Sequence, residues 1–234
     1  MKQFLPFVIS LFFFNPIAHS KEQTNQYFEI SNIEIHELID AGFGKMGNLD
    51  FYQFNNDLLL SKTMAPSIES LGKILQLIKI GKELWSVVES NKPVVNFSGD
   101  HVSVLPNTMT SPLQLQNWQG PETRAYRVVY KNAYGIEVVD FVFRIVFTHS
   151  GETPERQGKF IANAGIYPAH LDVAWGYNFD AKVISKKPIN LGSTKNPVAG
   201  QEMSLSWTVK TVLREHHRQL DFFIDGEGNL KSLF

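Results

Sequence analysis

The sequence predicts a mainly β fold: an antiparallel β-sandwich of about eight or nine strands, with one N-terminal amphipathic helix packed against it. Apolar and polar residues alternate with a period of two over most of the chain after Pro93. A helical period of apolar residues is confined to residues 67–90. Glycine-containing turn signals separate the alternating segments, and a sheet with this much apolar surface needs a second layer to cover it.

The first 20 residues have the composition of a secretory signal peptide. A basic tip at Lys2 precedes an apolar run at residues 4–14, and small residues stand one and three positions before a cleavage point in front of Lys21. The run is too short to cross a bilayer core of about 30 Å as a helix. We therefore expect an exported protein, either periplasmic or secreted.

Charge and cysteine content exclude several classes of function. The 234-residue chain carries 22 basic and 23 acidic side chains, a formal net charge of −1, and no cysteine. A balance this close to neutrality predicts no binding of nucleic acid. The missing cysteine excludes thiol catalysis and thiolate metal sites. Because no second apolar run of about 20 residues follows the leader, we expect no transmembrane helix in the mature protein.

The segment before the strands divides into an arm and a helix. Residues 21–65 show short apolar clusters without a sustained period, so we interpret them as a partly ordered N-terminal arm. The domain at residues 66–234 then opens with the helix, which Pro66-Ser67 begins. Its apolar side covers about half of the circumference. The opposite side carries lysines and glutamates in equal number, which favours packing on the sheet over insertion into a membrane interface.

The strand pattern is clearest in three segments, at residues 136–148, 171–183 and 203–214. In the second of these, Trp175, Tyr177 and Phe179 share one face, and charged or amide side chains share the other. This aromatic row is expected to lie in the core because its face needs cover. Further strands are predicted at residues 94–97, 101–105, 124–131, 159–167, 219–224 and 230–234, with a hairpin turn at residues 132–135.

Two longer connections interrupt the strands, at residues 149–158 and 185–201. In sandwich domains, loops on a rigid sheet scaffold carry the contacts with other molecules. We therefore predict interaction residues in these loops, at His149, Lys186 and Lys187.

No residue pattern indicates a metal, a cofactor or a catalytic residue. His216-His217 has the right ligand types, but neighbours on a strand face opposite sides and cannot share one ion. Residues 225–229 resemble a calcium loop only superficially, because the alternating carboxylates are missing, and they predict a hairpin turn instead. Common hydrolase and phosphate-binding motifs are absent as well. We expect a non-enzymatic protein, although a catalytic triad assembled from distant residues stays open.

The function that these observations favour is that of an exported binding or surface-interaction protein, whose partner is a protein, a glycan or a lipid. The alternative is a membrane-active protein, lipid-binding or pore-forming, that uses Trp85 of the helix or the row with Trp175 and Tyr177. An outer-membrane β-barrel is a further alternative, since long strands with alternating aromatic residues match its pattern. Asp140 and Arg144, opposite an apolar strand face, argue against the barrel.

Overall fold

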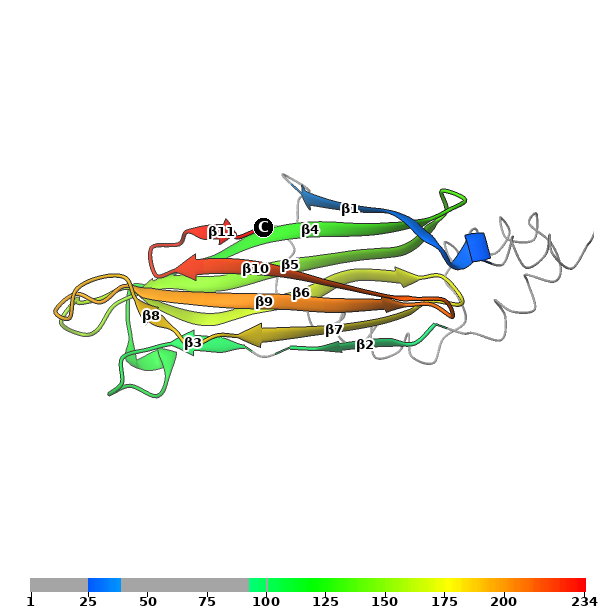
Figure 1. Ribbon diagram of the computed structural model, residues 1–234. Helices are drawn as coiled ribbons and strands as arrows, with labels where there is room; N and C mark the ends of the chain where they lie inside the picture. Colours follow the sequence, from blue (N-terminus) through cyan, green and yellow to red (C-terminus); the bar gives the residue numbers. More distant parts are fainter. Residues whose placement is uncertain (1–24, 39–92, 100) are drawn as a thin grey trace, which may run out of the picture.

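The computed structural model describes residues 25–38, 93–99 and 101–234, and it shows two β-sheets packed face to face (Figure 1). The first sheet has the order β1-β4-β5-β6-β3, with strands Ile30–Leu38, Gln119–Asn132, Glu137–Gly151, Phe160–Val173 and Val102–Val104. The second has the order β11-β10-β9-β7-β2, with strands Leu230–Ser232, Glu215–Asp225, Ala199–Lys210, Asn178–Ser185 and Val95–Ser98, and β8 (Ile189–Asn190) pairs with β9. The predicted sandwich is confirmed.

Each sheet is built around a meander of consecutive antiparallel strands. β4, β5 and β6 form the first meander, and β7, β9, β10 and β11 form the second. Two short strands, β2 and β3, extend the sheets at one edge, and β2 runs parallel to β7. Most of the pairing is therefore local along the chain, which is what the predicted hairpin turns require.

The prediction of one strand over residues 171–183 is wrong, because β6 and β7 lie in different sheets. They are joined by residues 174–177, where the amide of Tyr177 donates to the carbonyl oxygen of Ala174 at 3.2 Å. Gly176 has a φ of +87° in this turn. Glycine adopts a positive φ without a steric penalty, so the chain can bend here and cross from one sheet to the other.

The core between the sheets is rich in aromatic rings. Phe141 of β5 packs against Phe179 of β7 with ring centroids 4.8 Å apart, and Phe143 lies 5.9 Å from Phe222 of β10. All four rings are fully buried. Tilted and edge-on aromatic pairs of this kind add to the stabilisation that the buried area itself provides.

One polar contact crosses the core. Trp207 of β9 donates its indole N–H to the hydroxyl of Tyr130 on β4 at 2.8 Å. Both side chains are buried, and burial raises the pKa of Tyr130. The bond gives the buried indole N–H and the buried hydroxyl a partner, which avoids the cost of leaving polar groups unpaired in the core.

The strand β5 is buried on both faces. Phe141, Phe143, Ile145 and Phe147 face the core, while Asp140, Val142 and Arg144 on the other face are also buried. Asp140 receives the Nε and Nη2 groups of Arg127 at 2.9 and 2.8 Å. A bidentate pair of this geometry compensates the carboxylate for its loss of water.

Part of the predicted arm is a strand. β1 pairs in antiparallel register with β4 along the edge of the first sheet, and a short helical segment at residues 25–28 precedes it. The predicted helix at residues 67–90, and Trp85 with it, lies outside the described residues. No helix among the described residues has the length and apolar character needed to cross a bilayer.

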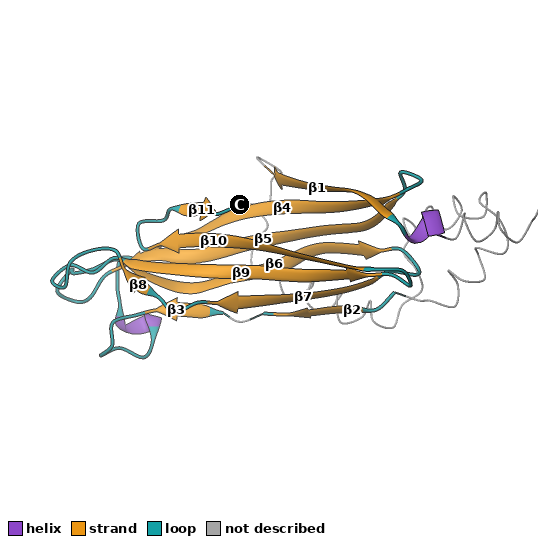
Figure 2. Cartoon of the chain, in the orientation of Figure 1, coloured by secondary structure: helices purple, strands orange, loops and turns teal. Residues whose placement is uncertain are grey.

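The sandwich is elongated along its strands, so it has two ends (Figure 2). We call one the turn end; it consists of residues 25–28, 133–136, 174–177 and 211–214. We call the other the loop end; it consists of residues 105–118, 152–159, 186–198 and 226–229. Figure 1 shows the turn end on the right and the loop end on the left.

Candidate functional site

The two long connections predicted from the sequence meet at the loop end. The amide of Lys159 donates to the carbonyl oxygen of Pro197 at 2.8 Å, and the amide of Ala199 donates to the carbonyl oxygen of Lys159 at 2.8 Å. Gly158 adds a bond from its amide to the side-chain oxygen of Asn196 at 2.8 Å. Backbone bonds satisfy groups that would otherwise need water, so the two connections form one ordered unit.

A groove opens at this end, between the 186–198 connection and the segment that follows β3. Its volume is about 370 Å³. The lining is mostly aliphatic and prolyl, and it consists of Val104, Leu105, Pro106, Asn107, Phe160, Pro188, Ile189, Asn190, Pro197, Val198 and Ala199. A concave apolar surface of this size with a few polar groups is the usual form of a binding site.

The wall formed by the 186–198 connection presents two large apolar side chains to solvent. Ile189 is 54 % exposed and Leu191 is 49 % exposed. The side chain of Asn190 holds this wall in place, because its oxygen accepts the amides of Gly192 and Val198, each at 3.0 Å. The exposed side chains are therefore fixed by the loop and do not come from a frayed terminus.

The 105–118 connection is fixed by a short 3-10 helix, η2 (Pro112–Gln114). Ser111 caps the helix, because its hydroxyl oxygen accepts a hydrogen bond from the amide of Leu113. In return, the amide of Ser111 donates to the side-chain oxygen of Gln114 at 3.0 Å. The indole N–H of Trp118 donates to the carbonyl oxygen of Pro112 at 3.1 Å. This reciprocal cap anchors the segment that follows the other wall of the groove.

His149 lies at the loop end but is only 6 % exposed. Its ring packs against Gly228, where an added Cβ would lie 2.5 Å from the ring. Its Nδ1 lies 2.9 Å from the hydroxyl of Ser150, and its Nε2 lies 3.7 Å from a carboxylate oxygen of Glu122. His149 therefore joins β5 to the β10–β11 turn and offers little surface to a partner.

The serine, histidine and glutamate at this point have the residue types of a catalytic triad. Ser150 has a φ of +61°, an unusual value for a serine. Its amide donates to the carbonyl oxygen of Gly226 at 3.0 Å, and its hydroxyl lies 3.4 Å from the same oxygen. The carboxylate of Glu122 is too far from His149 for a hydrogen bond. These contacts indicate a structural connection and give no support to a nucleophile.

Lys186 and Lys187 come directly before the groove, at the end of β7. Lys186 forms an ion pair with Glu202 of β9, and this hydrogen bond raises the pKa of the lysine. Lys187 is exposed. The two lysines therefore place positive charge beside the apolar groove, and the charge of Lys186 is already paired with Glu202.

Trp175 and Tyr177 lie at the turn end, far from the other predicted site residues. Tyr177 is fully buried, and its hydroxyl donates to the carbonyl oxygen of Tyr27. Desolvation raises its pKa well above the ordinary value. Tyr27 donates in turn to the carbonyl oxygen of Trp175 at 2.7 Å. The structure therefore divides the predicted interaction residues between two ends of the molecule.

A second depression lies on the outer face of the second sheet, over β2, β7, β9 and β10. Most of its lining residues are polar, and some of them bind one another. Asn96 donates to Asp180 at 2.5 Å, and Thr208 lies 2.8 Å from Nδ1 of His217. Because most of its side chains are polar or charged, this face suits an apolar ligand less well than the groove does.

Neither metal chemistry nor a known relative identifies the site. No group of three or more histidine, aspartate or glutamate side chains in the described part of the chain is placed to hold a metal ion. Comparison with protein-family models, with curated proteins and with solved structures gives no match. The groove and the side chains around it are therefore the features of the described residues that best indicate a function.

Proposed function

We propose that this protein is an exported, non-enzymatic binding module that holds an extended apolar segment of a protein partner in the loop-end groove. The observation that carries the proposal is the groove itself, which two chain segments enclose on a rigid sandwich. Export rests on the signal-peptide pattern of the first 20 residues.

The lining of the groove favours a protein partner over a glycan. Sugar rings stack on exposed aromatic faces, and the one aromatic residue in the lining, Phe160, is buried. Aliphatic and prolyl walls gain free energy by covering apolar side chains. The side-chain amide of Asn107 is exposed and makes no hydrogen bond within the described residues, so it can bind the backbone of an extended chain.

Peptide selection on the full chain tests this function. We expect a random peptide library to yield apolar sequences that bind the wild type, and Ile189→Asp to weaken them at least about tenfold, because a charge would replace an apolar contact. Leu213→Asp is a matched control, since Leu213 is 45 % exposed at the turn end. Equal binding to Ile189→Asp and the wild type, or no selected peptide, would contradict the proposal.

The export part of the proposal has its own test. N-terminal sequencing of the protein recovered outside the cytoplasm should begin at Lys21. Recovery of the whole chain in the cytoplasm, beginning at Met1, would contradict export without affecting the groove.

A further inference from the structure

The β9–β10 turn at the turn end is built to hold its tip in one conformation. The amide of Thr211 donates to the carbonyl oxygen of Arg214 at 2.8 Å and closes the hairpin. The hydroxyl of Thr211 accepts the amides of Leu213 and Arg214 at 3.2 and 3.1 Å. Thr211 itself is buried, so its side chain serves the turn and leaves the next two residues at the tip.

The tip carries apolar side chains where turns usually carry polar ones. Val212 is 53 % exposed and Leu213 is 45 % exposed. Neither belongs to the buried core cluster or packs against it within the described residues. Two adjacent aliphatic side chains held in water at the tip of a fixed hairpin cost free energy unless another surface covers them.

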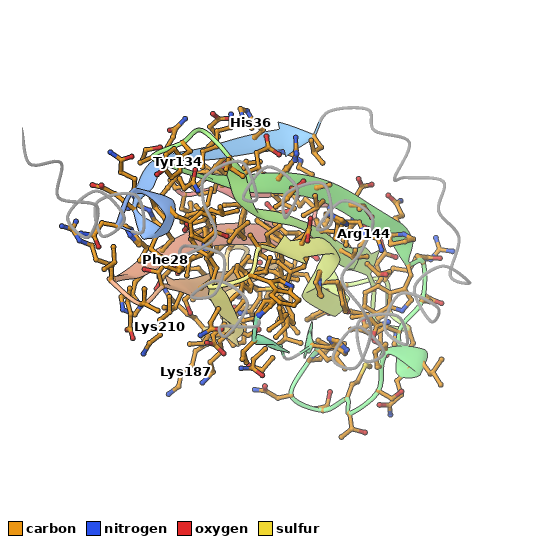
Figure 3. The ribbon with its side chains drawn as sticks, turned by 90° about the vertical axis from the view of Figure 1, so that its right-hand side faces the viewer. Phe28, His36, Tyr134, Arg144, Lys187 and Lys210 are labelled. Atoms are coloured by element: carbon orange, nitrogen blue, oxygen red, sulfur yellow. The ribbon has the colours of Figure 1, made fainter. Side chains whose placement is uncertain are left out.

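Cations surround this pair. Lys210 precedes it, and Arg214 and Arg218 follow it on the same hairpin. Lys210 is paired with Glu215, but in the described part of the chain no carboxylate forms an ion pair with Arg214 or Arg218. Figure 3 looks onto this end of the molecule, where Lys210 and Phe28 are labelled.

Two histidines and one acid follow the pair at the start of β10. His216 follows Glu215 on β10, and its pKa is lowered by burial first and then by the charges of Arg214, Arg218 and His217. His217 lies 3.6 Å from a carboxylate oxygen of Glu215, the first residue of β10. Asp180, on the neighbouring strand β7, is bound to Asn96. The tip is therefore apolar with an excess of cations around it.

We propose that the β9–β10 tip docks on an anionic lipid surface, with Val212 and Leu213 entering the headgroup layer and Arg214 and Arg218 contacting lipid phosphates. A convex apolar tip with unpaired arginines matches a layer that is apolar beneath and negative at its surface. This inference is independent of the groove at the loop end.

The position of the tip leaves the groove free. β9 spans 12 residues between the two ends, which separates them by about 40 Å at roughly 3.3 Å per residue. A molecule held by its tip would present the loop-end groove away from the lipid. One chain can therefore bind a membrane and a protein at the same time.

Vesicle co-sedimentation tests the inference with protein purified in the form that the expressing cell exports. The probes are vesicles of phosphatidylcholine alone and vesicles in which about one third of the lipid is phosphatidylglycerol. We expect binding to the anionic vesicles, and a loss of about tenfold or more in V212S/L213S. We expect a loss of about tenfold in R214Q/R218Q on anionic vesicles only, because the arginines act through lipid charge.

The loop end supplies a matched control. I189S/L191S removes two aliphatic side chains of similar exposure from the opposite end and should bind vesicles as the wild type does. Thermal unfolding of each variant shows that a loss of binding is not a loss of fold. Wild-type protein that stays in the supernatant with anionic vesicles overturns the proposal. Binding that V212S/L213S leaves unchanged also overturns it.

Discussion

The two ends of the sandwich expose similar apolar side chains but arrange them differently. At the loop end, Ile189 lines a groove, Leu191 follows it on the same connection, and backbone hydrogen bonds join this connection to the neighbouring one. At the turn end, Val212 and Leu213 stand on a single hairpin tip, near arginines that form no ion pair with the described carboxylates. We base the two proposals on this difference: a concave apolar surface suits an apolar chain, and a convex apolar tip with nearby cations suits an anionic lipid surface.

The ends also differ in how they are closed. At the turn end the space between the sheets is filled by an aromatic cluster of Tyr27, Phe28 and Tyr177, all fully buried. The ring centroids of Tyr27 and Phe28 are 4.9 Å apart, and those of Tyr27 and Tyr177 are 5.6 Å apart. The loop end relies on hydrogen bonds between connections, with His149 packed beneath the β10–β11 turn. Side-chain burial should therefore dominate stability at the turn end, and backbone conformation should dominate it at the loop end.

The largest expected loss of stability is in the aromatic cluster of Tyr27, Phe28 and Tyr177. Phe28→Ala should lower the free energy of unfolding by about 3–5 kcal/mol, because it empties a fully buried site against Gly176. Urea unfolding monitored by tryptophan fluorescence measures this. A loss below about 1 kcal/mol would mean that residues 25–28 do not belong to the folded core.

A pair of glycine substitutions compares the ends directly. Gly228 has a φ of +92° and Gly135 has a φ of +73°. An added Cβ would meet the ring of His149 at Gly228 but nothing within 4 Å at Gly135. We expect Gly228→Ala to cost about 2–4 kcal/mol and Gly135→Ala about 1 kcal/mol in urea unfolding. Equal losses in the free energy of unfolding would show that the β10–β11 turn can shift to make room for the added methyl group.

The next largest effect concerns Asn190, whose side chain orders the 186–198 wall of the groove. Asn190→Ala removes the acceptor for two backbone amides and should cost about 1–2 kcal/mol. Hydrogen exchange should quicken in residues 191–198 and stay unchanged in β9. Asn96→Ala, which removes an exposed asparagine bond elsewhere, serves as the control. Unchanged exchange at residues 191–198 would mean that Asn190 does not order the wall.

The smallest expected effect is a pH dependence at the turn end. Because the folded pKa of His216 is lowered from 6.5, its stabilisation is present above pH 6.5 and is lost as the pH falls through the lowered pKa. Between about pH 7 and pH 5, wild-type stability should fall by a few tenths of a kcal/mol more than that of His216→Gln. Urea unfolding at both pH values measures the difference, and parallel curves would contradict it.

The sequence could predict the sandwich because its strands alternate and its turns are short. The crossing at residues 174–177 stayed hidden for a physical reason. Leu171 and Val173 of β6 lie in register with core-facing residues of β5, and Tyr177 and Phe179 face the core from the other sheet. Odd-numbered residues therefore face the core both before and after the turn. Because the two-residue period continues unbroken, it cannot show that the chain changes sheets. Gly176 was the available signal.

The candidate site was predictable only in part. Length and composition indicated the two connections, but the wall that follows β3 was missed, since Val104, Leu105 and Pro106 resemble the end of a short strand. β1 was missed because an edge strand needs burial on one face only, and its alternation is weak. The exposed pair at the β9–β10 tip looked like a continuation of the strand, because apolar residues at 212 and 213 carry no turn signal.

The most direct test of the account is amide chemical-shift mapping of the wild-type chain with a selected apolar peptide. We expect the perturbed amides to cluster along the groove, at residues 104–107 and 189–199, and the amides of residues 211–214 not to respond. Perturbations at the turn end, or over the outer face of the second sheet, would contradict the assignment of the loop end as the protein-binding site.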